Sequence, residues 1–300
     1  MDELRFDGRA VVVTGAGRGI GRSHALLLAA RGAKVVVADS GSELDGSGSS
    51  RGPAAEVAQE IEANGGEAVA CCASVADEDG AASIVATAIE HFGHLDVVVN
   101  NAGISDKHPF HELSHEQFRR MMDVHFFGTL YVTKAAWPHL VDAGYGRIVN
   151  TTSEGVLGAQ AELTSYGSAK GAVWALTRNL AAEGVGHGIG VNAVAPRART
   201  RMSEDGQRVP AGTAPEQRSE SVLDRMDPEL VAPAAAYLAH ESCTLSGEVL
   251  VAGGGDVMRL APIVTRGIVR GKQLSVEDIA ESIDAILDST DARVAPVGSW

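Results

Sequence analysis

Two side chains in the stretch SYGSAK, Ser165 to Lys170, have the types and the spacing for proton transfer. Tyr166 and Lys170 are four residues apart, which on a helix places them on one face, one turn from each other. An ammonium near a phenol stabilises the phenolate, so a tyrosine with an ordinary pKa of about 10 would exchange protons closer to neutral pH. The alternative is an ordinary helical aromatic residue beside an unrelated surface lysine, since this spacing also recurs by chance.

A glycine-rich stretch near the N-terminus, TGAGRGIG from Thr14 to Gly21, has the features of a phosphate-binding turn. It follows an apolar run, precedes a segment of helical period, and has glycines at Gly15, Gly17, Gly19 and Gly21. Such a turn lets the backbone approach a pyrophosphate closely and directs a helix N-terminus at its charge. The spacing is not the literal GxGxxG, and a tight strand-to-helix turn without a ligand is the alternative.

Asp39 follows the next apolar run, eighteen residues beyond Gly21. A carboxylate there can accept hydrogen bonds from both hydroxyls of an adenine ribose and would repel a 2′-phosphate, which favours NAD over NADP. Arg18, within the glycine turn, favours NADP instead, because a basic side chain could meet such a phosphate. We weight Asp39 more heavily and expect NAD, with an acidic surface residue that merely ends a strand as the alternative.

Seven short apolar runs alternate with Ala-rich segments of helical period along the chain. They are AVVVTG from Ala10, KVVVAD from Lys34, AVACCAS from Ala68, LDVVVNNAG from Leu95, GRIVNTTS from Gly146, IGVNAVAP from Ile189 and GEVLVAGGG from Gly247. Runs that are apolar on both faces are typical of parallel strands covered by helices on both sides. The pattern predicts one doubly wound α/β (Rossmann) domain over residues 1–255, with a seven-stranded parallel sheet and its ligand beyond the carboxyl ends of the strands.

Two segments interrupt this alternation, and a third follows it. The Gly/Ser-rich stretch Ser40–Pro53 and the polar stretch Arg197–Glu220 are longer than connections need to be, which is typical of functional or disordered loops. Residues 256–300 form a C-terminal extension with one expected amphipathic helix, SVEDIAESIDAILD, which has Ser275 as its N-cap and acidic residues in its first turn.

The composition is that of an ordinary globular protein of 300 residues, 45% of them hydrophobic, with a net charge of −14. This charge argues against nucleic acid and anionic membrane surfaces as partners. The three cysteines have no metal-ligand spacing, so we expect no metal site, and their odd number fits a reducing compartment. The N-terminal residues contain no signal-peptide core and no apolar run approaches membrane-spanning length, so we expect a cytoplasmic protein.

With these motifs placed, the chain resembles the short-chain dehydrogenase/reductase family over about its first 255 residues. TGAGRGIG, NNAG, GRIVNTTS and YGSAK occur in the family's order, and Ser153 precedes Tyr166 by thirteen residues, the family's spacing between its catalytic serine and tyrosine. The resemblance implies an NAD-dependent enzyme in which Tyr166 is the general acid or base toward a secondary alcohol or ketone. Lys170 would lower the pKa of Tyr166 and hold the nicotinamide ribose, and Ser153 would hydrogen-bond the substrate oxygen.

The resemblance also implies which residues contact the cofactor. They are Thr14, Gly15, Arg18, Gly19, Ile20, Gly21, Asp39, Ser74, Val75, Asn101, Ala102, Gly103, Thr151, Tyr166, Lys170, Pro196 and Ala198. Within NNAG, a structural role for Asn100 and Asn101, in which they hydrogen-bond neighbouring strands, is an equal alternative.

Three positions depart from the family's pattern. His125 stands where the family usually has an asparagine that holds a proton-relaying water. An imidazole can also donate and accept, so we predict a relay role, with a histidine satisfied by the backbone of a kinked helix as the alternative. Ala73 replaces an aspartate that bonds the adenine, which leaves backbone groups of Ser74 and Val75 for that task. Arg197 stands where a glycine generally follows the family's proline, which puts the local loop geometry in doubt.

His125, the insertion after Asp39, TKAAWPHL and LAHESC together resemble the 3-hydroxyacyl-CoA dehydrogenase domains of peroxisomal multifunctional enzyme type 2 and their steroid-active bacterial relatives. The implied function is a 3-hydroxyacyl-CoA dehydrogenase. A hydroxysteroid or other secondary-alcohol dehydrogenase is the second hypothesis, and a non-catalytic NAD-binding regulator is a remote third.

A polyanionic acyl-CoA would need a local basic cluster on so acidic a chain. The segment that begins at Arg197 could supply it with Arg197, Arg199, Arg201 and Arg208, or these arginines form an ordinary solvated face. Two long amphipathic helical segments, FRRMMDVHFFGTLYVTKAAWPHL and TSYGSAKGAVWALTRNLAAEG, correspond to those that pair subunits in relatives, so we expect a homodimer or homotetramer.

Overall fold

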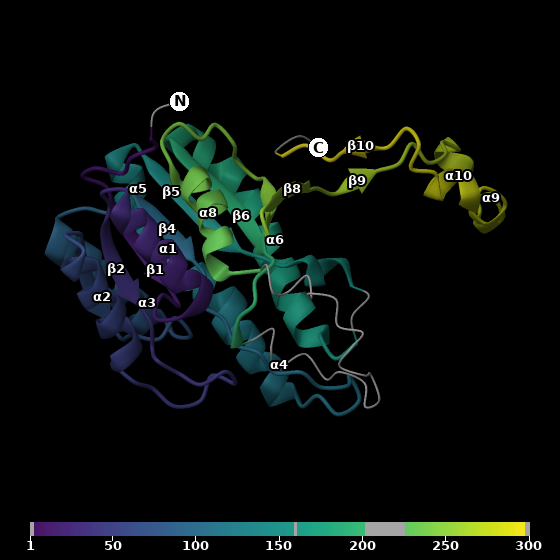
Figure 1. The fold of residues 1–300 in the computed structure, drawn as a ribbon. Helices are drawn as coiled ribbons and strands as arrows, with labels where there is room; N and C mark the ends of the chain where they lie inside the picture. The colour runs from purple at the N-terminus through teal and green to yellow at the C-terminus, as the bar shows by residue number, and fades with distance from the viewer. Residues whose placement is uncertain (1–2, 159–160, 202–225, 298–300) are drawn as a thin grey trace, which may run out of the picture. The chain divides into compact units, whose positions relative to one another are not determined.

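The computed structural model describes residues 3–158, 161–201 and 226–297 of the chain (Figure 1). It divides into two compact units, Met1–Arg259 and Leu260–Trp300. The first unit is built on an eight-stranded sheet of order β3-β2-β1-β4-β5-β6-β7-β8. Its strands are β1 Ala10–Thr14, β2 Lys34–Ala38, β3 Glu67–Cys71, β4 Val97–Asn100, β5 Gly146–Thr151, β6 Ile189–Pro196, β7 Val249–Gly253 and β8 Asp256–Leu260.

Parallel pairing links β3 through β7, and the valine runs of the central strands are buried from both faces. The chain builds the sheet outward from β1 in one direction through β2 and β3, then crosses to β4 on the other side of β1. This reversal creates a crevice at the carboxyl ends of β1 and β4, which is where ligands bind in doubly wound sheets. The predicted doubly wound α/β fold is confirmed.

Helices cover both faces of the sheet. They are α1 Gly19–Ala30, α2 Gly52–Ala63, α3 Glu78–Phe92, α4 His115–Met122, α5 Gly128–Ala143, α6 Thr164–Gly184 and α8 Ala232–Ala239. On one face α1 contacts α2 and α8, and on the other α3 contacts α5 while α4 contacts α6 (Figure 1). A π-helical turn, Asp123–Phe127, joins α4 to α5. The SYGSAK stretch lies at the start of α6, so the predicted helical placement of Tyr166 and Lys170 is confirmed.

The prediction of seven strands is wrong by one. After β7 the chain turns through Gly254 and Gly255, whose φ angles of +62° and +89° lie in the left-handed region, and continues as β8. The side chains of Val257 and Met258 on β8 are 60% and 41% exposed. An edge strand of this kind needs no continuous buried run, so periodicity gave no signal for it.

The second unit contains a short antiparallel pair, β9 Ile263–Val264 with β10 Arg293–Val294, and two short helices, α9 Val276–Glu281 and α10 Ile283–Leu287. Ser275 caps α9 as predicted, in a capping box where its hydroxyl accepts from the Asp278 N–H. The expected single helix is divided at Ser282, whose backbone departs from helical angles. Among the described residues no helix has both the length and the apolar character needed to cross a membrane.

Candidate active site

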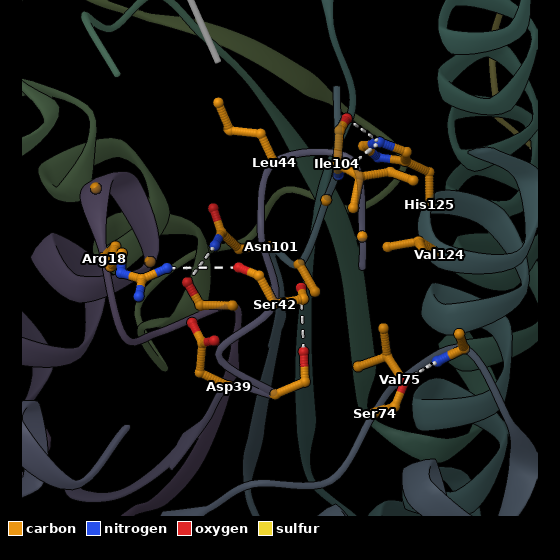
Figure 2. A pocket seen from close by; sticks show the side chains of 18 of the residues that line it. Arg18, Asp39, Ser42, Leu44, Ser74, Val75, Asn101, Ile104, Val124 and His125 are labelled. Carbon is orange, nitrogen blue, oxygen red and sulfur yellow. Dashed lines mark hydrogen bonds between the residues drawn. The ribbon is translucent and has the colours of Figure 1, made fainter. Parts of the chain in front are cut away.

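A cavity of about 750 Å³ opens at the carboxyl ends of β1, β2, β4, β5 and β6 (Figure 2). Most of the predicted site residues line it, namely Gly15, Arg18, Gly19, Ile20, Gly21, Asp39, Ser74, Val75, Asn101, Ala102, Gly103, His125, Thr151, Tyr166, Lys170 and Pro196. Three predicted residues do not. Thr14 is 2% exposed and its hydroxyl accepts from the Asn101 and Ala102 N–H groups, while Ala198 packs against the hydrophobic core. Ser153 lies beside Tyr166 instead of on the cavity wall.

Ser153, Tyr166 and Lys170 lie where β5 ends and α6 begins, and Tyr166 and Lys170 line the cavity. The Ser153 hydroxyl accepts from the Gly155 N–H at 3.0 Å and lies near the Tyr166 phenol, whose pKa it lowers. The Lys170 ammonium nitrogen donates to the Thr151 carbonyl at 2.7 Å and lies 5.8 Å from the centre of the Tyr166 ring. The helical spacing predicted from the sequence therefore brings a hydroxyl, a phenol and an ammonium together at one place.

Burial controls the protonation of this group. It raises the pKa of Tyr166, which the hydrogen bond with Ser153 partly offsets. Burial also lowers the pKa of Lys170 from 10.5 to about 7. Desolvation thus disfavours the charged forms of both groups, and the role expected of Lys170, lowering the pKa of Tyr166, stays a prediction.

His125 lies on the π-helical turn, 1% exposed, with its ring edge-to-face against Tyr166 at 5.3 Å between centres. Its Nε2 is within hydrogen-bond distance of both the N–H (3.1 Å) and the carbonyl (2.9 Å) of Ile104, while Nδ1 has no partner among the described residues (Figure 2). Burial and the nearby Lys170 hold the pKa of His125 well below its ordinary value. The neutral ring therefore presents one unpaired nitrogen, whichever tautomer it adopts.

The turn at His125 is held from the helix side as well. The Thr129 hydroxyl donates to the His125 carbonyl at 2.8 Å. Opposite the ring, a Cβ on Gly103 would lie 2.5 Å from His125 Cε1, so only a glycine fits there. The histidine is therefore satisfied at Nε2 by the Ile104 backbone across the crevice, and not by its own helix.

The glycine turn is shaped for close backbone approach. Gly15 has a φ of +64°, and a Cβ there would lie 2.8 Å from Ala102 Cα. A Cβ on Gly21 would overlap the Gly15 carbonyl, so this position admits only glycine. The Asn101 side chain donates to the carbonyls of Thr14 (3.0 Å) and Gly15 (3.2 Å), which locks the turn to the end of β4.

Asn100 takes part in a buried hydrogen-bond network, in which its amide donates to the Asn150 and Thr133 side chains at 2.9 Å each. The structural interpretation of the NNAG asparagines is therefore confirmed.

The residues around the turn fit a dinucleotide. The first turn of α1 has no acidic residue and no side-chain cap, so its free N–H groups are available to a pyrophosphate. Asp39 accepts from the Gly17 N–H at 2.8 Å and from the Gly41 N–H at 2.7 Å, and its carboxylate remains on the cavity wall. Ser74 accepts from the Ala76 N–H at 3.1 Å, in the segment predicted to hold the adenine.

The insertion after β2, residues 40–51, contributes to the cavity in a way that the sequence did not indicate. Its Leu44 carbonyl accepts from the Ser105 N–H at 2.8 Å, and its Ser42 carbonyl accepts from Arg18 at 3.4 Å (Figure 2). Arg120 on α4 donates to the Asp45 carbonyl at 3.4 Å. The insertion thus spans from the end of β2 to the loop after β4. The sequence shows that this insertion is longer than a connection needs to be. It does not show which residues the insertion contacts, because these are distant in sequence.

Two arginines of the predicted basic cluster lie against carboxylates. Arg197 forms a two-point ion pair with Glu154, and Arg201 lies 4.0 Å from Glu43. Arg208 lies outside the described residues. Among the described residues no group of three or more His, Cys, Asp or Glu side chains could hold a metal ion.

Known proteins with similar sequences or structures agree with this geometry. A family model described as short chain dehydrogenase matches residues 9–208. A Mycobacterium tuberculosis protein named as a short-chain type dehydrogenase/reductase is 44% identical, over 96% of each chain. Peroxisomal multifunctional enzyme type 2 of Mus musculus is 37% identical over 96% of this chain, which spans 38% of that enzyme's length.

A solved 7α-hydroxysteroid dehydrogenase, complexed with NADH and 7-oxo glycochenodeoxycholic acid, superimposes with a TM-score of 0.73. It is 30% identical and covers 85% of this chain and 98% of its own. The family model covers two thirds of the sequence, and the tyrosine, the lysine and the glycine turn share one cavity, with the serine beside the tyrosine. The chain therefore belongs to the short-chain dehydrogenase/reductase family of NAD(P)-dependent oxidoreductases.

Proposed function

We propose that this enzyme is an NAD-dependent 3-hydroxyacyl-CoA dehydrogenase. The observation that carries the substrate class is the extent of the similarity. The mouse multifunctional enzyme matches 96% of this chain, extension included, whereas the hydroxysteroid dehydrogenase structure covers 85%. A match that leaves only 4% of this chain uncovered includes most of the extension, and this supports a shared substrate-binding arrangement, because specificity resides in the parts that a common fold does not require.

The proposed roles follow from the positions of three side chains. The Ser153 hydroxyl holds the substrate oxygen and stabilises its developing charge. Tyr166 takes the proton of the alcohol, and its bond with Ser153 orients the phenol for this. Lys170, held by the Thr151 carbonyl, supports the phenolate when its amine is protonated. When bound, NAD supplies the hydride acceptor.

His125 is proposed as the next group in proton transfer. Its unpaired Nδ1 can accept or donate, depending on which way Nε2 bonds Ile104. Its edge-to-face contact with Tyr166 also fixes the plane of the phenol. The relay role predicted from the sequence therefore stays a prediction, now with a named atom.

The preference for NAD rests on Asp39. Two backbone N–H groups hold its carboxylate in place at the end of β2, where an adenine ribose would bind. A fixed anion there repels a 2′-phosphate. Arg18, the residue that favours NADP, donates to the Ser42 carbonyl of the insertion. The other residues proposed to contact the dinucleotide are those that line the cavity, together with Thr14 behind the turn.

A hydroxysteroid dehydrogenase is the second candidate. It is favoured by the neutralisation of Arg197 and Arg201, because a free steroid needs no basic site for phosphates.

Assembly as a homodimer or homotetramer through α5 and α6 is part of the proposal, as is an NAD-binding domain over residues 1–255 followed by an extension.

A matched pair of substrates separates the two candidates. NADH formation would be followed with a 3-hydroxyacyl-CoA and with a free 17β-hydroxysteroid, each with NAD and with NADP. The proposal predicts turnover of the thioester with NAD. Turnover of the steroid alone would favour the second candidate, and a higher kcat/KM with NADP would contradict the role given to Asp39.

A further inference from the structure

Arg197 and Glu154 form an ion pair next to the catalytic centre. The Arg197 Nε donates to Glu154 Oε2 at 2.7 Å and its Nη2 donates to Oε1 at 2.6 Å, so the guanidinium and carboxylate meet at two points. Two parallel charge-assisted bonds fix direction as well as distance, unlike a single contact between charges. Both side chains are about one third exposed, at 35% and 37%.

The pair joins two segments that carry the site. Glu154 directly follows Ser153, and Arg197 directly follows Pro196 on the cavity wall. The strands that precede them, β5 and β6, are neighbours in the sheet. Their last backbone link is the bond from the Thr152 N–H to the Val194 carbonyl at 2.9 Å. The ion pair therefore links the two segments beyond the last backbone hydrogen bond between them.

The two partners are not equally anchored. The Arg197 N–H donates to the Ala252 carbonyl at 2.8 Å, and Gly253 approaches the Arg197 carbonyl so closely that a Cβ would overlap it. Glu154 instead begins a short 3₁₀ turn, Glu154–Leu157, without buried residues. Arg197 is thus the more firmly held partner, and its guanidinium group restrains the turn that carries Ser153.

The charges of the pair support this restraint. Arg197 lowers the pKa of Glu154, mainly through the side-chain hydrogen bond, so the carboxylate is ionised at neutral pH. The arrangement also engages Arg197 with an internal carboxylate, which removes it from any cluster that would bind substrate phosphates. Because the pair is partly exposed, its effect on global stability is expected to be small.

We propose that Glu154 and Arg197 are positioning residues that hold the Ser153 turn against the end of β6 and so set where the serine hydroxyl meets the substrate oxygen. This inference rests on the proposed function for its catalytic consequence. A glycine in place of Arg197, the usual residue of the family at this point, would leave the turn without this restraint. Displacements of about 1 Å in a catalytic group cost on the order of a hundredfold in rate.

The test compares Arg197→Ala and Glu154→Gln with the charge-reversed double variant Arg197→Glu with Glu154→Arg. Arg259→Ala is the matched control, because Arg259 makes the same two-point pair with Glu248 at 2.7 Å in both bonds, away from the cavity. For each purified enzyme, kcat and KM would be measured on the alcohol that the wild type oxidises, along with the Kd for NADH. We expect the single variants to lose about ten- to a hundredfold in kcat with the Kd for NADH nearly unchanged. The double variant is expected to regain most of the lost kcat. The control, Arg259→Ala, is expected to show no loss of kcat.

A second readout does not depend on turnover. The Tyr166 phenol would be titrated by its phenolate absorbance, with the spectrum of the same variant carrying Tyr166→Phe subtracted. Since the Ser153 hydrogen bond lowers the pKa of Tyr166, displacing the serine should raise that pKa in Arg197→Ala and not in Arg259→Ala. An enzyme inactive on all alcohols would refute the proposed function, and the titration would still decide the positioning role. Unchanged kcat and Tyr166 pKa in Arg197→Ala, or equal losses in Arg259→Ala, would overturn it.

Discussion

Replacing Lys170 with methionine should stabilise the protein while removing a group proposed to take part in catalysis. Lys170 is 3% exposed, and among the described residues its ammonium has one acceptor, the Thr151 carbonyl. Methionine has a similar length and no charge, so it fills the same space without the cost of desolvating an ammonium. Active-site groups of this kind are held in place at the expense of stability.

The size of the effect follows from the shifted pKa. The fall in the pKa of Lys170 from 10.5 to about 7 corresponds to at most about 5 kcal/mol lost by the native state while the unfolded lysine is protonated. Removing the donor to the Thr151 carbonyl costs about 1–2 kcal/mol in return. The net gain for Lys170→Met near neutral pH is therefore about 3 kcal/mol.

The direction in which the stability difference changes with pH also follows from the lowered pKa of Lys170. Below pH 7 both states of the wild type carry the proton, and the native state bears the full penalty of burial. Between pH 7 and 10.5 only the unfolded state binds it, so wild-type stability rises with pH relative to the variant. The raised pKa of Tyr166 acts in both proteins and cancels in the difference.

Urea unfolding of the wild type and Lys170→Met would be compared at about pH 6 and about pH 9.5. We expect the variant to be more stable at the lower pH and the advantage to shrink to about zero at the higher. A difference that does not change with pH, or a variant less stable near pH 6, would refute the reasoning that burial controls this lysine.

Four further substitutions test other parts of the molecule. Gly21→Ala should cost about 1–3 kcal/mol and abolish NADH binding measured by fluorescence, because the added Cβ overlaps the turn's own carbonyl. Gly171→Ala on α6, where nothing lies within 4 Å of the added Cβ, should instead stabilise by about 0.5–1 kcal/mol. Asp39→Ala should lower the ratio of kcat/KM for NAD over NADP by about tenfold or more, and an unchanged ratio would contradict its role. His125→Phe keeps a ring against Tyr166 but removes both nitrogens, so a relay predicts a kcat at least about tenfold lower. Its thermal unfolding is expected at a lower temperature, because the Ile104 backbone loses the Nε2 partner at a cost of about 1–3 kcal/mol.

The parts of the fold that the sequence predicted are those encoded by local patterns. Valine runs specified the buried strands, the Tyr166–Lys170 spacing specified one helix face, and the glycine turn needed only its own residues. Strand β8 was missed, because an edge strand carries no continuous apolar signal.

Contacts between distant segments were beyond such patterns. The bond from His125 to Ile104 crosses the crevice, and the pairing of Arg197 with Glu154 joins two strands, so neither has a signature in either segment alone. Spacing also predicts that Lys170 is close to Tyr166, but not that burial shifts the pKa of each group.

The most direct test of the proposed chemistry is NADH formation from NAD and a 3-hydroxyacyl-CoA by the wild type and by Tyr166→Phe. Phenylalanine keeps the ring that packs against His125 and removes only the hydroxyl that bonds Ser153. We predict turnover by the wild type and a loss of about a hundredfold or more in the variant, with the Kd for NADH unchanged. Turnover by Tyr166→Phe at the wild-type rate would contradict the assignment of this tyrosine as the group that exchanges the proton.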